Sequence, residues 1–271
     1  MNYLQFDFKT ENEEQAEILL ALLADAGFEG FEEETDQLKA CIKETELDEQ
    51  KLADIRKIIP LEPGRTVIRP ENWNAQWESS FEPVMVNDFA VIRAGFHLPV
   101  KNVQHEIIIT PKMSFGTGHH ATTFLMIEQM SKLDLRDKTV LDFGTGTGVL
   151  AILAEKMGAK KIKAIDNDDW SIENSKENIT ANSCSKINVE KADSILVNEK
   201  YDIILANINL NVILANLPGI AASAKKSTIV LLSGFLASDE QPILNAIVQY
   251  GFTRISTSPK GAWICLNLQK N

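Results

Sequence analysis

The segment that most constrains the fold of this chain is VLDFGTGTGVLA, at residues 140–151. Its first four residues are typical of a buried strand, and the residues after the glycines are typical of a helix. Gly144, Gly146 and Gly148 permit positive φ angles and let a ligand approach the backbone closely. The helix that follows directs free N–H groups and a positive dipole end at that ligand. We therefore predict a strand, a ligand-binding turn and a helix, with Asp142 as a carboxylate beside the ligand.

The chain around this turn alternates between strand and helix patterns from residue 113 onward. Strands are expected at 139–143, 161–166, 187–190, 201–208 and 227–234, with helices between them and two closing strands at 252–258 and 262–268. Such alternation predicts an α/β fold: a mostly parallel, Rossmann-like sheet covered on both faces, with an antiparallel edge. A cofactor should then lie over the carboxyl ends of the first strands.

The start of the chain has a different pattern, which predicts a small α+β domain. Strands are expected at 3–8, 28–33, 37–43 and 65–68, and helices at 11–26 and 47–59. This β-α-β-β-α-β order is ferredoxin-like. We assign residues 1–60 to this domain, 61–83 to a proline-punctuated linker and 84–271 to the second domain. Within the linker, Trp73 and Trp77 are spaced to share one helix face, where they either anchor the linker or line a substrate cleft.

The net charge of −11 is concentrated in the first domain. Residues 1–60 hold 16 acidic and 6 basic residues of the chain totals of 38 and 27, which leaves 22 acidic and 21 basic residues elsewhere. This segment should repel a phosphate backbone and attract a basic protein, although an acidic surface also simply aids solubility.

Other bulk features exclude several classes of protein. No apolar run is long enough to cross a membrane, and the first residues lack the pattern of a signal peptide, so we expect the mature chain to begin here. The three cysteines are far apart in sequence, which favours a reducing cytoplasm over a disulfide framework or zinc site. His119 and His120 are adjacent and lack a third ligand at suitable spacing, so no metal site is expected.

The glycine turn by itself fits two ligands. Residues 146–151 match the dinucleotide pattern G-x-G-x-x-A, whereas residues 142–148 match the S-adenosylmethionine loop of methyltransferases. Asp166, at the end of the next strand, can accept the ribose hydroxyls of either ligand or cap the following helix. Residues 192–194 fall where a loop would meet an adenine ring. Asn207 ends the strand at 201–208, where its carbonyl can orient an amine or the methionine part of the cofactor, or simply open a helix.

A second glycine-rich loop, at residues 113–124, precedes the first strand of the alternating region. Gly116 and Gly118 bend this loop. Thr122 and Thr123 then open a helix, with hydroxyl groups available for capping or for a ligand carboxylate.

These segments together resemble one protein family. FGTGHHATT, DFGTGTGVLAI, AIDND and LANI, in this order and spacing, are similar to the PrmA family of bacterial methyltransferases, which modify large-subunit ribosomal protein eleven. The Trp-x-x-x-Trp linker, the SGF segment at 233–235 and the small first domain extend the resemblance over nearly the whole chain. Where the family usually has GTGTHPTT, this sequence has GTGHHATT, so His119 and Ala121 replace a threonine and a proline.

The resemblance implies S-adenosyl-L-methionine as cofactor and amino groups as acceptors, namely the N-terminal α-amine and lysine side chains taken to the trimethyl state. Residues expected at the cofactor are Thr123, Gly144, Asp166, Asn207, Asp142, Gly146, Phe115 and Gly116. Asn207 is the expected catalytic residue, which orients the amine or the cofactor, and no general base is evident. The first domain is expected to recruit the basic ribosomal substrate and to make no direct contact with nucleic acid. The protein is expected in the cytoplasm, and the sequence does not predict its oligomeric state.

Three alternatives remain open from the sequence. The first is a related methyltransferase that acts on another acceptor, such as another protein, RNA or a small molecule. The second is a nicotinamide-dependent oxidoreductase, and the third is a non-catalytic adaptor. We also expect Gly144→Arg to abolish cofactor binding while leaving the fold largely intact, because its side chain would fill the space where the ligand approaches.

Overall fold

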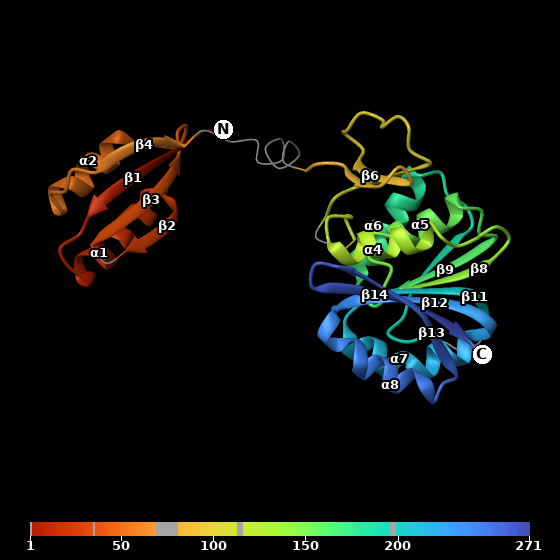
Figure 1. Ribbon diagram of the computed structural model, residues 1–271. Coiled ribbons are helices and arrows are strands. Elements are labelled where there is room, and N and C mark those ends of the chain that lie inside the picture. Colours follow the sequence, from red (N-terminus) through yellow and green to blue (C-terminus); the bar gives the residue numbers. More distant parts are fainter. Residues whose placement is uncertain (1, 35, 69–80, 113–115, 196–198) are drawn as a thin grey trace. The chain divides into compact units, whose positions relative to one another are not determined.

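The computed structural model describes residues 2–34, 36–68, 81–112, 116–195 and 199–271. The chain divides into two compact units, Met1–Ser79 and Ser80–Asn271, and each unit can be followed in Figure 1. Trp73, Trp77 and Phe115 lie outside the described residues, so the predictions made for them stay predictions.

The first unit is one antiparallel sheet with two helices. Its elements are β1 (Tyr3–Lys9), α1 (Glu13–Asp25), β2 (Glu29–Glu34), β3 (Gln37–Lys43), α2 (Glu49–Ile58) and β4 (Gly64–Ile68). The strand order is β2-β3-β1-β4, and each neighbouring pair is antiparallel. The predicted ferredoxin-like order is therefore confirmed.

Alternating side chains of this sheet form the core of the first unit. Phe6 and Phe8 of β1 and Leu38 of β3 are almost fully buried. Leu23 of α1 and Leu52 of α2 pack into the same cluster. Because successive strand residues point to opposite faces, one face of β1 and β3 meets the helices. The period-2 pattern in the sequence therefore located this core.

The predicted end of the first domain at residue 60 is wrong. Strand β4 pairs with β1 along the register from Tyr3 opposite Ile68 to Asp7 opposite Gly64. This pairing is long-range, so the sheet continues into residues assigned to the linker, and the first unit extends to Ser79. Prolines around β4 favoured a linker, but an edge strand tolerates prolines at its ends.

The second unit begins with a small three-stranded sheet. Strands β5 (Val84–Val86), β6 (Ala90–Ala94) and β7 (His105–Ile109) lie in that order, with β5 antiparallel and β7 parallel to β6. The strand β5 was not predicted, because three residues carry no readable period. Arg93 is buried and donates to both carboxylate oxygens of Glu106, at 2.7 and 3.1 Å.

The rest of the second unit is the predicted α/β region. Its elements are α4 (Ala121–Met130), β8 (Thr139–Phe143), α5 (Val149–Lys156), β9 (Lys161–Asp166), α6 (Asp169–Ala181), β10 (Ile187–Lys191), β11 (Tyr201–Asn207), α7 (Leu210–Ser223), β12 (Ala224–Leu236), η1 (Ala237–Asp239), α8 (Glu240–Val248), β13 (Phe252–Lys260) and β14 (Trp263–Lys270). The seven strands have the order β10-β9-β8-β11-β12-β14-β13, and only the pairings of β14 are antiparallel.

Helices cover both faces of this sheet, as predicted. Helices α4, α5 and α6 lie on one side and α7 and α8 on the other (Figure 1). Two separate buried clusters correspond to these faces. Strand order reverses between β8 and β11, so a crevice is expected beyond the carboxyl ends of these neighbours. No helix within the described ranges is long and apolar enough to cross a membrane.

Candidate functional site

The glycine turn after β8 is held by strand β9. The Gly144 and Thr145 amides donate to the Ile165 carbonyl at 2.9 and 3.0 Å, and Gly144 has φ +76°. A Cβ at Gly144 would lie 2.1 Å from the Ile208 side chain. The glycine is therefore required by a neighbouring chain segment as well as by its backbone angle. Our expectation that Gly144→Arg leaves the fold largely intact is not supported by this contact.

Asp142 lies beneath the turn and outside the cavity. Its side chain is fully buried, and its Oδ2 accepts from the Thr145 hydroxyl at 2.7 Å. Burial raises the pKa of this carboxyl to about 7, the Asp166 charge adds to the shift, and the Thr145 hydroxyl and Ala151 amide oppose it. The structure thus places Asp142 as a support for the turn, without exposing it to a ligand.

The second glycine loop braces the first one. The Thr147 hydroxyl donates to the Gly116 carbonyl at 2.8 Å, and a Cβ at Gly116 would lie 2.7 Å from that hydroxyl. The Thr147 carbonyl in turn accepts from the Asn178 amide of α6 at 2.8 Å. Gly116, which we expected at the cofactor, is therefore close to the turn but does not line the cavity described next.

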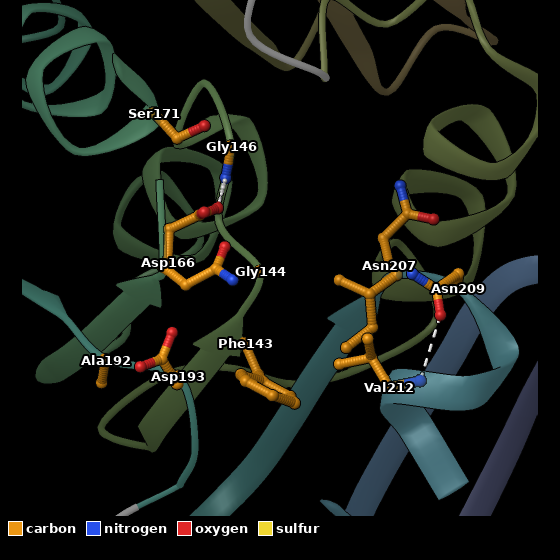
Figure 2. A pocket seen from close by; sticks show the side chains of 12 residues that line it. Phe143, Gly144, Gly146, Asp166, Ser171, Ala192, Asp193, Asn207, Asn209 and Val212 are labelled. Atoms are coloured by element: carbon orange, nitrogen blue, oxygen red, sulfur yellow. Dashed lines mark hydrogen bonds between the residues drawn. The ribbon is translucent and has the colours of Figure 1, made fainter. Parts of the chain in front are cut away.

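A cavity of about 290 Å³ lies beyond the carboxyl ends of β8, β9 and β11. Four predicted residues line it: Gly144, Gly146, Asp166 and Asn207. Figure 2 shows Asp166 and Asn207 on opposite sides of this cavity. The lining residues that our site prediction did not include are Phe143, Asn167, Ser171, Ala192, Asp193, Ile208, Asn209 and Val212, of which Ala192 and Asp193 belong to the loop expected at the adenine ring. Asn167 follows β9, and Ile208 and Asn209 follow β11, so their places after strand ends are the signal that could have located them.

Asp166 faces the cavity and a different residue caps the following helix. One carboxylate oxygen of Asp166 accepts from the Gly146 amide at 2.9 Å and the other from the Asp168 amide at 3.1 Å. Asp168 accepts from the Ser171 amide and hydroxyl, and it is the N-cap of α6. The choice left open by the sequence is thereby resolved: Asp168 is the cap, and Asp166 orders the turn beside the cavity.

Asn207 occupies the opposite side of the cavity and is not a helix cap either. Asn209 caps α7 by accepting from the Val212 amide at 3.0 Å. Asn207 is 8% exposed, and its amide nitrogen lies 3.4 Å from the Thr123 hydroxyl. Its Oδ1 is buried and has no hydrogen-bond partner among the described residues. A buried amide oxygen without a donor is the kind of group that a ligand N–H or O–H satisfies.

The two neighbouring histidines point to different partners. The Nε2 atom of His119 lies 3.1 Å from the Glu82 carbonyl oxygen, and its Nδ1 atom lies 3.2 Å from the Thr117 hydroxyl oxygen. His120 is the N-cap of α4, and its Nδ1 accepts from the Thr122 amide at 3.3 Å. Within the described ranges, no cluster of three or more metal-ligating side chains occurs.

Comparison with known proteins shows the family to which this chain belongs. A family model described as ribosomal protein L11 methyltransferase (PrmA) matches residues 3–271. The chain belongs to this family. It is 38% identical to the ribosomal protein L11 methyltransferase of Phocaeicola vulgatus, with 97% of each chain covered. It is 39% identical to that of Chlorobaculum parvum, with 97% of this chain and 95% of the relative covered.

A solved structure supports the same assignment. The ribosomal protein L11 methylase of Lactobacillus delbrueckii subsp. bulgaricus is 29% identical, with a TM-score of 0.66 over 70% of this chain and 100% of that one. Membership in the PrmA family confirms the predicted methyltransferase class, its class I Rossmann-like fold and S-adenosylmethionine as cofactor. The nicotinamide alternative is set aside, because the family match includes the glycine turn that it relied on.

Proposed function

We propose that this chain transfers methyl groups from S-adenosylmethionine to amino groups of ribosomal protein L11, namely its N-terminal α-amine and lysine side chains. The observation that carries the proposal is that Asp166 and Asn207 face one cavity beyond the strand ends. Because ribosomes are assembled in the cytoplasm, the reaction is placed there. After incubation of purified ribosomal protein L11 with this chain and S-adenosylmethionine, mass spectrometry should show additions of one to three methyl groups per amine. An unchanged mass would contradict the choice of acceptor.

The residues of the first cavity suit an S-adenosylmethionine molecule. Asp166 presents carboxylate oxygens that accept the ribose hydroxyls, and the backbone at Gly144 and Gly146 allows close approach. Residues 192 and 193 are assigned to the adenine ring. Thr123 is fully buried and reaches this site through Asn207, so we assign it a positioning role. Asp142 and Gly116 support the turn from outside the cavity.

The chemistry requires alignment and a neutral amine. S-adenosylmethionine supplies a methyl group bonded to a positively charged sulfur. The lone pair of the neutral acceptor nitrogen forms the new N–C bond as the C–S bond breaks, and the sulfur takes the electron pair of that bond. The methylated ammonium group formed in this way loses a proton to solvent before the next transfer. The Nδ1 atom of His120 already accepts from the Thr122 amide at 3.3 Å, so this nitrogen is not open to take a proton from the amine. Desolvation of the amine therefore replaces a general base.

The first unit is proposed to recruit the substrate through its charge. With the boundary at Ser79, the first unit holds 19 acidic and 8 basic residues, whereas the second holds 19 of each. Strand β2 is an edge of the first sheet, and its glutamates Glu29, Glu32, Glu33 and Glu34 are exposed. An acidic edge strand combines open backbone groups with attraction for a basic protein.

Charge reversal tests this role better than truncation. A deletion of residues 1–60 would leave β4 without β1, its partner in the sheet. Glu33→Lys should raise the KM for ribosomal protein L11 about threefold at low salt, because it reverses one charge on the docking edge, and the effect should fade as salt rises. Glu173→Lys, an exposed glutamate of α6 in the second unit, is the matched control. An equal rise in KM for both variants would contradict recruitment by β2.

A further inference from the structure

A second cavity lies beside the first. It has a volume of about 240 Å³, and His120, Thr122, Gly234 and Trp263 contribute to its lining. Residues 207–209 line both cavities, so this segment separates them. We propose that the second cavity receives the amine-bearing arm of the protein substrate, with Trp263 as the residue that sets its specificity. This inference rests on the proposed amine methylation and assigns the acceptor its place.

The segment between the cavities is fixed in position. The Ile208 amide donates to the Ser233 carbonyl at 3.1 Å. A Cβ at Gly144 would lie 2.1 Å from the Ile208 side chain, and a Cβ at Gly234 would lie 2.3 Å from its carbonyl oxygen. Two glycines, one in the turn after β8 and one in β12, therefore pack directly against Ile208. Because this segment is held from both sides, Asn207 at its start has a fixed position between the two cavities. A group bound in one cavity is therefore next to a group bound in the other at Asn207.

Asn207 provides the polar contact for an amine at this meeting point. It lines both cavities, it is more than nine-tenths buried, and its Oδ1 has no partner within the described part of the chain. A neutral amine donates an N–H to such an oxygen and keeps its lone pair free. The amide nitrogen is already directed to the Thr123 hydroxyl, which leaves the oxygen for the ligand. Asn207 therefore orients the acceptor nitrogen toward the first cavity.

The remaining walls favour an apolar arm that ends in a neutral or methylated nitrogen. The rings of His120 and Trp263 meet edge to face with centroids 4.6 Å apart. Of the residues that line this cavity in the described ranges, none is aspartate or glutamate. Without a carboxylate, a desolvated amine is not held as an ammonium ion. An indole ring still attracts the trimethylated ammonium group, which carries no N–H and so has no hydrogen bonds to lose. These properties suit successive methylation of one amine.

Substitution of Trp263 in the full chain tests the inference. Trp263→Leu should raise the KM for ribosomal protein L11 about tenfold and shift products from trimethylated toward monomethylated amines, because the aromatic wall is lost. Trp263→Phe should restore most of the trimethylated product. The dissociation constant of S-adenosylhomocysteine, measured by calorimetry, should stay within about twofold of the unaltered chain, since Trp263 does not line the first cavity. Trp170→Leu, which removes a tryptophan that is 73% exposed, is the matched control.

The outcomes separate the two proposals. If the unaltered chain leaves ribosomal protein L11 unmodified, the proposed function fails. If it methylates the substrate and Trp263→Leu gives the same KM and product distribution, the assignment of the second cavity is wrong. A Trp263→Leu protein that binds S-adenosylhomocysteine poorly would indicate general damage to the site. The Trp263→Phe variant then decides. If it binds S-adenosylhomocysteine normally but still gives mainly monomethylated products and a KM raised about tenfold, an aromatic wall at Trp263 is not what the substrate requires, and the assignment is overturned.

Discussion

Replacing Asp142 with asparagine should remove a large part of the pH dependence of stability in the second unit. The carboxyl is fully buried beneath the glycine turn. Burial raises its pKa from 3.8 to about 7, against the opposing effects of the Thr145 hydroxyl and the Ala151 amide. Asparagine has nearly the same shape and keeps an oxygen for Thr145, but it does not ionise.

The magnitude follows from the difference between the folded and unfolded pKa values. A shift of about 3 pKa units corresponds to about 4 kcal/mol of unfolding free energy. Because the folded pKa is raised, the carboxyl costs nothing below pH ~4, where both states are protonated. As pH rises, the unfolded chain ionises first and stability falls until the pH passes the folded pKa. About 3 kcal/mol of this loss should lie between pH 5 and pH 8.

Hydrogen exchange in increasing urea can measure this effect in the second unit alone. Peptides from β8 and β11 report the free energy of opening of this unit at pH 5 and at pH 8. The unaltered chain should lose about 3 kcal/mol more than Asp142→Asn between these two pH values. Asp202→Asn is the control, because hydrogen bonds from Lys225 and Thr139 outweigh burial and lower its pKa to about 2, so its contribution is constant over this range. An equal pH dependence in Asp142→Asn and the unaltered chain would refute the reasoning.

Three further substitutions test the site and its supports. Gly144→Ala should cost about 1–3 kcal/mol and weaken S-adenosylhomocysteine binding, because its Cβ meets Ile208 at a positive φ angle; urea unfolding and calorimetry measure both, and unchanged stability would contradict the contact. Asp168→Ala should cost about 1 kcal/mol by removing the N-cap of α6, read by hydrogen exchange in α6. Arg93→Leu should cost about 2–4 kcal/mol, because Glu106 loses a buried partner that donates to both of its oxygens; a melting temperature equal to that of the unaltered chain would argue against this ion pair.

Local signals in the sequence determined much of this protein. The glycine turn, the strand and helix periods and the order of elements predicted both folds, because these depend on residues that are near one another in the chain. Gly144 and Gly146 were found from the glycine-rich pattern, and Asp166 and Asn207 from their places at strand ends; all four line the first cavity. In a parallel sheet the carboxyl ends of neighbouring strands meet at one edge, so their residues converge without further information.

Only the tertiary structure decided which of these side chains are exposed to a ligand and what lies behind them. Asp142 carries the same sequence signal as Asp166, yet the packing of α5 and the turn buries it completely. A strand at 65–68 was expected, but the boundary at residue 60 assigned it to the linker, because its partner β1 is about sixty residues away in the chain. Trp263 reaches the second cavity only because β14 pairs beside β12 and brings it near α4. Pairing and packing between distant segments depend on the whole chain, and no local pattern records them.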